Sequence, residues 1–139
     1  MTQEDKELLL RDLCARLPYS LCVQDEYGEI DYVNYHDVHF ANYFDSILNG
    51  KVKPYLRPMS SMTEEEAKEI QEIIGNPDYA CITIKTDGLE LWLNFIDTDP
   101  TIWLDAIFEV QDYLNKNHFD YRGLIEKGLV IDATGLNIY

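Results

Sequence analysis

The sequence contains two pairs of residues whose side chains commonly bind metal ions, but the spacing within each pair is weak evidence for a site. Asp97 and Asp99 end an apolar segment, and two carboxylates at the end of a strand are a common start for a magnesium site. Asp99 also precedes Pro100, an arrangement typical of a helix cap, and no third ligand is spaced to join the pair. His36 and His39 lie in a strand-like pattern, in which residues three apart point to opposite faces. We therefore expect neither a bound metal nor a cofactor.

Residues that could act as nucleophiles lack the sequence context of a catalytic site. The sequence holds no GxSxG, GxGxxG, Walker A or HExxH motif. His118 is isolated, and Ser60 and Ser61 precede a predicted helix, where hydroxyl groups serve turns and caps. Three cysteines lie in apolar patterns without CxxC spacing, which predicts reduced, buried thiols: Cys14, Cys22 and Cys81. The sequence predicts no catalytic residue.

The composition excludes several classes of protein. The 139 residues include 26 acidic residues against 11 lysines and arginines, which gives a formal charge of −15. This charge argues against direct nucleic-acid binding through a basic face and against docking on an anionic membrane. The hydrophobic content of 46% is enough for a packed core, so the chain is not intrinsically disordered, and the length fits a single domain over residues 1–139.

The sequence also carries no sign of export or membrane insertion. The N-terminal segment MTQEDKELLL has acids where a signal peptide carries basic residues. No apolar run approaches the roughly 20 residues that a membrane-spanning helix needs. We therefore expect a soluble, cytoplasmic protein.

The acidic residues are concentrated in two stretches. Residues 17–50 hold six acids and residues 86–115 hold seven, and neither stretch contains a lysine or an arginine. Two interpretations remain open. The acids can form a solvated surface that keeps the protein soluble, or they can face a partner of opposite charge.

Two helices are indicated by capping signals and by apolar residues at helical spacing. Residues 3–16 follow a capping pair made by Thr2 and Asp5. Residues 64–74 begin after a capping box at Thr63. A third helix is expected from Pro100 to about residue 115, with an apolar stripe made of Ile102, Trp103, Ala106, Ile107, Val110, Tyr113 and Leu114.

Strands are predicted over residues 19–25 and 29–40, joined by a tight turn. The alternation of apolar residues slips in the second of these, which a bulge or a strand covered on both faces would explain. Residues 51–57 could add an edge strand. A central position is unfavourable there, because Pro54 and Pro58 each lack a backbone donor for the ladder.

Residues 80–96 form the clearest predicted hairpin. The dipeptide Asp87-Gly88 is typical of a type I′ turn, and a turn centred there pairs residues whose numbers sum to 175. That register places Lys85 opposite Glu90, a favourable cross-strand charge pair. In the tail, a short helix is possible over residues 121–127.

The order helix, strands, helix, hairpin, helix predicts an α+β fold. We expect a small, largely antiparallel sheet packed by about three helices. No internal repeat or linker divides the chain.

Several segments are similar to a known group of proteins. They are residues 8–19 (LLLRDLCARLPY), 53–66 (KPYLRPMSSMTEEE) and 118–125 (HFDYRGLI), together with Gly128-Leu129 and residues 133–139 (ATGLNIY). These segments resemble a group of small uncharacterised proteins encoded in gut-bacterial genomes, phages and mobile elements. The resemblance implies origin and the extent of one full-length domain. That group has no assigned activity, so no catalytic residue is carried over from it.

These observations favour a non-enzymatic acidic protein that binds another protein. The partner surface is predicted on the outer face of the third helix, where three acids lie together without a lysine or arginine, and on the hairpin: Asp105, Glu109, Asp112, Glu90 and Trp92. Two alternatives remain open. One is an inhibitor from a phage or mobile element that mimics nucleic acid, and the other is a metal-dependent enzyme that uses Asp97 and Asp99.

Overall fold

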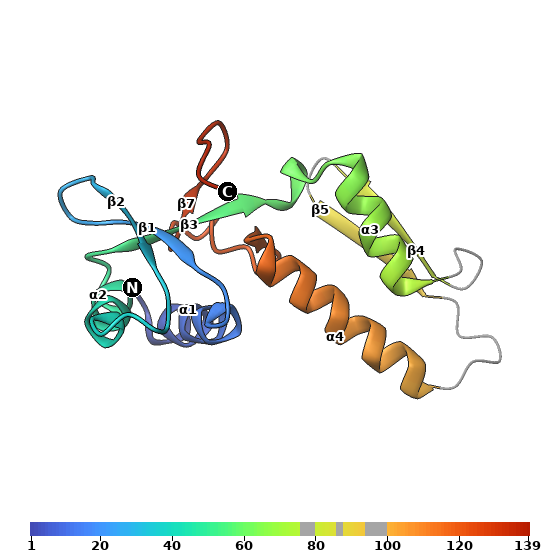
Figure 1. Cartoon of the computed structure of the whole chain (residues 1–139), viewed down its shortest axis with the longest axis horizontal. Helices are drawn as coiled ribbons and strands as arrows, with labels where there is room; N and C mark the ends of the chain where they lie inside the picture. The colour runs from blue at the N-terminus through green and yellow to red at the C-terminus, as the bar shows by residue number, and fades with distance from the viewer. Residues whose placement is uncertain (76–79, 86–87, 94–99) are drawn as a thin grey trace.

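The computed structural model describes the whole chain except residues 76–79, 86–87 and 94–99, and between residues 80 and 104 it describes the backbone alone. The described part holds four α-helices, a short 3₁₀ helix and seven strands (Figure 1). In chain order they are α1 Gln3–Arg16, β1 Leu21–Gln24, β2 Ile30–Val33, α2 Phe40–Leu48, β3 Lys53–Pro58, η1 Met59–Ser61, α3 Glu64–Ile74, β4 Ala80–Lys85, β5 Gly88–Leu93, α4 Pro100–Lys116, β6 Phe119–Asp120 and β7 Ile131–Asp132. The predicted α+β class is confirmed.

The larger sheet has five strands, in the order β2-β1-β3-β6, with β7 also paired to β3. β1 runs antiparallel to both β2 and β3, whereas β6 and β7 pair with β3 in parallel. β4 and β5 form a separate antiparallel pair. Three of the five ladders are therefore antiparallel, as expected. The sequence did not predict the two parallel ladders or the fourth helix, α2.

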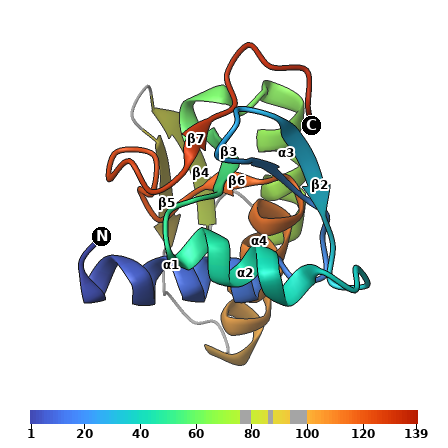
Figure 2. The ribbon, with the colours of Figure 1, turned by 90° about the vertical axis from the view of Figure 1, so that its left-hand side faces the viewer.

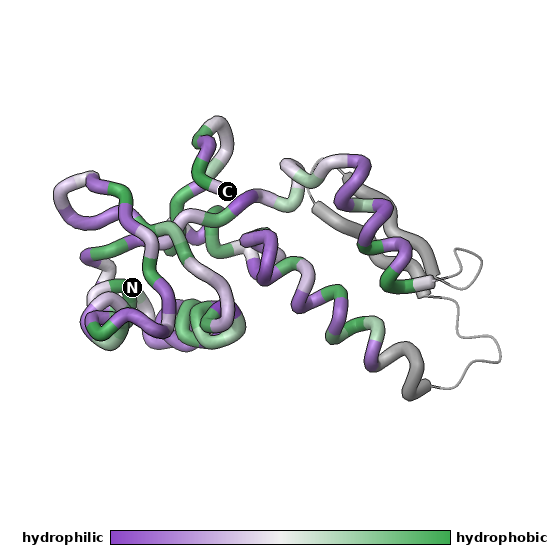
Figure 3. Tube along the Cα trace, viewed as in Figure 1, coloured by the Kyte–Doolittle hydropathy of each residue, from purple (hydrophilic) through white to green (hydrophobic). Residues whose placement is uncertain are grey.

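Among the side chains that the structure describes, hydrophobic residues gather in two main clusters, which lie in different parts of the molecule. The first lies between the sheet and the helices α1 and α2, which run side by side beneath it (Figure 2), and it includes Leu9, Val23 and Leu56. The second lies around α3 and α4 and includes Ile70 and Phe119. Hydrophobic and hydrophilic residues alternate along α3, as expected of a helix with one buried face (Figure 3).

The predicted helix starts are confirmed at α1 and α3. The hydroxyl of Thr2 accepts a hydrogen bond from the Asp5 amide, and the Asp5 carboxylate accepts one from the Thr2 amide. Thr63 and Glu66 form the same reciprocal pair at α3. Each box satisfies two backbone donors that the first turn of a helix leaves unpaired.

The second predicted strand is much shorter than expected. β2 ends at Val33, and residues 40–48 form α2 instead of continuing a strand or a loop. The slip in alternation that suggested a bulge marks the end of the strand. Four residues of α2 face the first cluster at helical spacing: Phe40, Tyr43, Phe44 and Ile47.

The expectation that residues 51–57 form only an edge strand is wrong. β3 lies inside the sheet, paired with β1 on one side and with β6 and β7 on the other. The prolines are tolerated because they lie near the ends of the paired segments. Pro54 belongs to the two-residue ladder with β1, and the parallel ladders begin at Tyr55 and end at Pro58.

The predicted register of the second hairpin is wrong, because each residue pairs with a partner two positions earlier in the chain than expected. β4 and β5 pair residues whose numbers sum to 173, so Lys85 lies opposite Gly88 and Thr83 lies opposite Glu90. The two registers bring the same sets of residues to the same faces, so the apolar pattern does not distinguish them. The predicted turn residue Asp87 lies outside the described residues, as do the side chains of Leu91 and Leu93.

Three smaller expectations are also corrected. Residues 121–127 form turns rather than a short helix. Cys14 is exposed, whereas Cys22 is buried as predicted. Ile107, expected in the buried stripe of α4, is 41% exposed, while Val110 and Leu114 in that stripe are buried.

Among the described residues, no helix is both long enough and apolar enough to span a membrane.

Buried charges join the two parts of the molecule. Arg16 at the end of α1 is 1% exposed and forms an ion pair with Asp12, with nitrogen–oxygen distances of 2.7 and 3.0 Å. The same guanidinium donates to the carbonyl oxygens of Asn115, at the end of α4, and of Phe119 in β6. Arg122 adds a contact of 3.3 Å to the Asp12 carboxylate. The orientation of α1 against α4 is therefore set by directional polar contacts.

Candidate interaction surface

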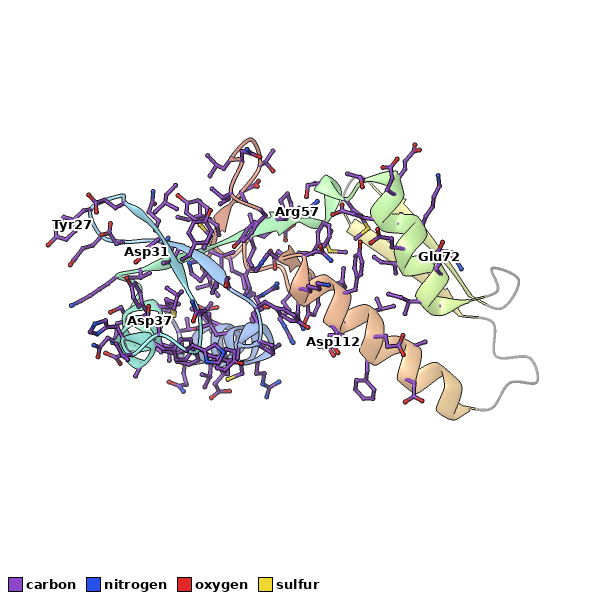
Figure 4. All side chains as sticks on the ribbon, viewed as in Figure 1. Tyr27, Asp31, Asp37, Arg57, Glu72 and Asp112 are labelled. Atoms are coloured by element: carbon purple, nitrogen blue, oxygen red, sulfur yellow. The ribbon has the colours of Figure 1, made fainter. Side chains whose placement is uncertain are left out.

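The acids predicted on the third helix are accessible, but they do not meet the other acidic stretch. Asp105, Glu109 and Asp112 are all exposed on α4. In Figure 4, Asp31 and Asp37 lie at one end of the molecule, well apart from Asp112, which lies near its middle. The described acids of the two stretches thus belong to two separate surfaces.

The remaining predicted site residues do not form a site that the structure describes. Glu90 lies in β5 opposite Thr83, and Trp92 lies opposite Cys81, but their side chains are outside the described part. Asp97 and Asp99 are likewise outside it. In the described parts of the chain, no group of three or more His, Cys, Asp and Glu side chains is placed to hold a metal ion.

His36 and His39 do not lie in a strand. Both belong to the turns between β2 and α2, and His39 is the residue that precedes α2. The His36 ring contacts the Tyr35 ring at a centroid distance of 3.8 Å. Opposite faces of a strand therefore do not separate the two histidines.

The turn between β1 and β2 is held by one carboxylate and displays a tyrosine. Asp25 Oδ1 accepts hydrogen bonds from the backbone N–H groups of Tyr27 and Glu29, at 2.9 and 2.8 Å. Gly28 has φ +85°, a left-handed conformation that completes a three-residue hairpin loop and that other residues rarely adopt. Tyr27 at the tip is 83% exposed. The loop therefore fixes the backbone while the ring stays in solvent.

The two faces of β2 have different environments. Val33 is buried in the first cluster, and Asp31 on the same face accepts a hydrogen bond from the Tyr43 hydroxyl of α2. Ile30 and Tyr32 point to the opposite face and are 46% and 51% exposed. The Tyr32 hydroxyl donates to the Ile138 carbonyl at 3.2 Å, so the C-terminal segment covers part of this face.

Exposed large hydrophobic side chains are concentrated along this hairpin and the segment that follows it. Tyr35 and Val38 are exposed in the segment between β2 and α2. Five of the 11 large hydrophobic residues exposed in the described part of the chain lie within residues 27–38. A cluster of this kind is typical of a surface that contacts another molecule, whereas isolated exposed hydrophobic residues are common.

The same residues carry an unbalanced negative charge. Five acids lie among or beside the exposed hydrophobic residues, and no lysine or arginine occurs between residues 17 and 50. The hydrogen bond from Tyr43 lowers the pKa of Asp31, which keeps this carboxylate ionised. We call this region the hairpin surface, made of Tyr27, Ile30, Tyr32, Tyr35 and Val38 with Asp25, Glu26, Glu29, Asp31 and Asp37.

A cleft of about 200 Å³ elsewhere in the protein is a weaker candidate. It lies beside Arg57, Ser61 and Tyr139. The Arg57 guanidinium forms two hydrogen bonds with the Glu66 carboxylate, at 2.7 and 2.9 Å, and lies over the Phe119 ring. Because Glu66 balances its charge, Arg57 offers little attraction to a small anion in this cleft.

The sequence showed the concentration of acids in residues 17–50, but it did not locate the hairpin surface. The missing step was the end of β2 at Val33, because a strand that continued to Phe40 would have placed Tyr35 and Val38 within the sheet. A scan of protein-family models, a search of curated proteins and a search of solved structures each found no match for this chain.

Proposed function

We propose that this chain is a non-enzymatic domain that binds another protein through the hairpin surface. The observation that carries the proposal is the concentration of exposed tyrosine and aliphatic side chains within residues 27–38, on a hairpin whose turn is fixed by Asp25. Tyrosine is enriched in protein interfaces because its ring gives a large contact area at little cost in side-chain entropy.

The rigid presentation of these side chains supports the same function. The hydrogen bonds to Asp25 hold the tip, and the hydrogen bond from Tyr43 to Asp31 ties β2 to α2. A surface that is already ordered loses less conformational entropy on binding than a mobile one. The hairpin surface can therefore contribute affinity without a costly rearrangement.

The charge of the surface favours a basic partner. Acids surround the exposed hydrophobic residues, and no basic side chain within residues 17–50 offsets them. Complementary charge accelerates association and disfavours acidic competitors, and this effect weakens as salt screens the field. Binding should therefore be faster at low than at high ionic strength.

A nucleic-acid mimic is less well supported than a protein-binding domain. A mimic needs carboxylates along one continuous ridge, where phosphates would lie. Asp31 and Asp37 at the hairpin lie well apart from Asp112 on α4 (Figure 4). We therefore propose protein binding alone.

The proposal is tested by partner capture followed by affinity measurement. Proteins that the purified chain retains from a bacterial lysate are identified by mass spectrometry, and the affinity of each is then measured with purified components. The Glu26→Lys/Glu29→Lys variant should bind the true partner at least about tenfold more weakly, because it reverses two exposed charges of the surface.

A matched variant on the other acidic surface separates a specific loss from a general effect of charge. Glu109→Lys/Asp112→Lys changes the net charge by the same amount on α4, so it should leave the affinity within about twofold of the parent. If the α4 variant loses the partner and the hairpin variant keeps it, the contact surface is on α4 and the proposal for the hairpin is wrong.

A further inference from the structure

The outer edge of β2 has backbone groups available to a further strand. β2 is the last strand of the larger sheet and, among the described residues, it pairs with β1 alone. It also forms the outer margin of the molecule in the view of Figure 2. An edge strand of this kind is a template on which an extended segment of another protein can pair.

The register of the hairpin identifies which groups face outward. The Asp25 amide donates to the Glu29 carbonyl, so this pair is hydrogen-bonded across the hairpin. Hydrogen-bonded pairs alternate with pairs that lack hydrogen bonds along an antiparallel ladder, so Val23 and Asp31 form the next hydrogen-bonded pair. Ile30 and Gln24 form the intervening pair, which has no hydrogen bonds between the strands. The N–H and C=O groups of Ile30, and those of Tyr32, therefore point away from β1.

Contacts on the other strand support this assignment. Cys22 lies opposite Tyr32 in the ladder, and its amide donates to the Tyr139 hydroxyl at 3.2 Å instead of to β2. The pairing of Cys22 with Tyr32 is thus one of the pairs without hydrogen bonds between the strands. By the same alternation, the backbone groups of Ile30 are directed to the open edge.

One of the outward donors is already occupied. The Tyr32 amide donates to the Asp31 carboxylate at 2.8 Å. This contact blunts the edge in the absence of a partner, as inward or local charges do at many sheet edges. Asp31 remains exposed, so a basic side chain can reach its carboxylate.

We propose that the hairpin surface binds an extended, basic segment of its partner by strand addition to β2. The inference rests on the proposed function and names its mode of binding. The segment pairs with the N–H and C=O groups of Ile30 and donates a further hydrogen bond to the Tyr32 carbonyl. Its alternate side chains lie against the exposed faces of Ile30 and Tyr32, and its lysines or arginines contact the acids of the surface.

The charge of the edge selects this occupant over others. Five acids lie within the thirteen residues 25–37, which hold no lysine or arginine. A second copy of this chain would bring the same acids against them, and like charges across neighbouring strands are destabilising. A basic extended segment can form hydrogen bonds with the outward N–H and C=O groups of β2, and its positive side chains balance the negative charge of the surface.

The first test is amide hydrogen exchange measured by NMR in the intact chain. The probe is an octapeptide in which lysine and valine alternate. At saturation, the Ile30 amide should exchange at least about tenfold more slowly than in the free protein, because its N–H becomes hydrogen-bonded. A peptide of the same sequence that is N-methylated at both the lysines and the valines has no backbone donor on either edge, and it should not protect Ile30.

The second test removes the outward donor from the protein. Ile30→Pro deletes the N–H that faces the open edge and leaves the ladder to β1 intact, since proline is tolerated at such edge positions. It should weaken binding of the octapeptide, and of any partner captured through the hairpin surface, at least about tenfold. Ile30→Thr keeps the N–H and the β-branched shape, and should change affinity less than about threefold.

The outcomes distinguish strand addition from protein binding in general. If Glu26→Lys/Glu29→Lys loses the partner while Ile30→Pro retains it and the Ile30 amide stays unprotected, strand addition is wrong and the proposed function stands. If both variants retain the partner, the hairpin surface is not the contact and both proposals are wrong. The unfolding midpoints of the two Ile30 variants are measured as a control, because a variant that unfolds would also lose binding.

Discussion

The region built on the five-stranded sheet and the region built on α3 and α4 cover their hydrophobic residues in different ways. In the first, α1 and α2 cover one face of the sheet, and part of the other face is covered by the C-terminal segment, where Cys22, Tyr55 and Ala133 are buried. In the second, Ile70 of α3 packs with Val110 and Leu114 of α4. The first region nevertheless leaves its outermost hairpin uncovered, and this is the feature that points to a partner.

Among the side chains that the structure describes, the apolar clusters of the two regions are separate, and buried charges join the regions. Arg16, Asp12 and Asn115 are each at most 2% exposed and lie between the two clusters. A buried ion pair with complete hydrogen bonding contributes less to stability than to a defined geometry, but the loss of one partner leaves the other charge uncompensated. We therefore expect the loss of a charged side chain at this joint to destabilise the protein strongly.

The largest expected effect is at this joint. Arg16→Ala removes the contacts to Asp12, Asn115 and Phe119 together and leaves the Asp12 carboxylate buried, with Arg122 at 3.3 Å as a remaining cation. The free energy of unfolding in urea should fall by about 3–5 kcal/mol.

Arg11→Ala is the matched control, because Arg11 lies on the same helix and is exposed. It should change the free energy of unfolding by less than about 0.5 kcal/mol. A loss below about 1 kcal/mol in Arg16→Ala would mean that the two regions do not depend on the joint.

The next effect concerns pH, through a histidine at the same joint. His118 is 8% exposed, its Nδ1 has no hydrogen-bond partner among the described residues, and its ring stacks on Tyr139 at 3.9 Å. Burial, together with the charges of Arg16 and Arg57, lowers the pKa of His118 to about 4 from its ordinary value of 6.5. Between these two values the unfolded chain binds a proton that the folded chain does not, so stability falls as the pH decreases from 6.5 to 4.

The contribution of His118 to this loss should reach about 3 kcal/mol, at about 1.4 kcal/mol per pKa unit. His118→Asn isolates it, because asparagine tolerates the φ of 60° at this position and does not titrate. Carboxylates titrate in both proteins, so the difference between the two pH profiles reports the histidine. Parallel profiles from pH 7 to 4 would show that His118 is accessible to protons in the folded state.

The two capping boxes give a third and smaller comparison between the regions. Thr63→Ala removes an acceptor from the start of α3 and also loosens Glu66, which holds Arg57. It should lower the free energy of unfolding by about 1–2 kcal/mol.

Thr2→Ala removes the equivalent acceptor from α1, but its partner Asp5 has a weaker second contact, at 4.0 Å to Lys127. The loss should be about 0.5–1 kcal/mol, measured in the same urea titrations. A greater loss at Thr2 than at Thr63 would show that the contact between Glu66 and Arg57 adds nothing to the cap.

Local signals in the sequence were sufficient for the α+β class and for the starts of α1 and α3. Capping boxes, prolines and apolar spacing act within a few residues, so a single sequence displays them directly. The ladders of β3 with β6 and β7 join residues more than 60 positions apart, such as Arg57 with Phe119. No local pattern encodes such a pairing, and Pro54 and Pro58 favoured an edge position for this strand instead.

The candidate surface was missed for a related reason. Apolar residues such as Tyr32 and Val38 are read from sequence as parts of a core, and their exposure depends on where β2 ends and on what covers its outer face. The burial of Arg16 and His118 was equally hidden, because charged and polar residues are mostly exposed unless distant partners enclose them.

The smallest expected effects on stability come from replacing one exposed aromatic side chain in each region. Tyr27 is 83% exposed at the hairpin tip, and Phe108 is 60% exposed on α4. Each makes few contacts that a serine would lose, so Tyr27→Ser and Phe108→Ser should each change the free energy of unfolding by less than about 0.5 kcal/mol. In contrast, Tyr27→Ser should weaken partner binding by about tenfold, since an interface tyrosine commonly contributes 1–2 kcal/mol, while Phe108→Ser should leave binding unchanged. If the two variants lower the affinity equally, the exposed hydrophobic residues of both regions contact the partner, and the difference between the regions does not extend to binding.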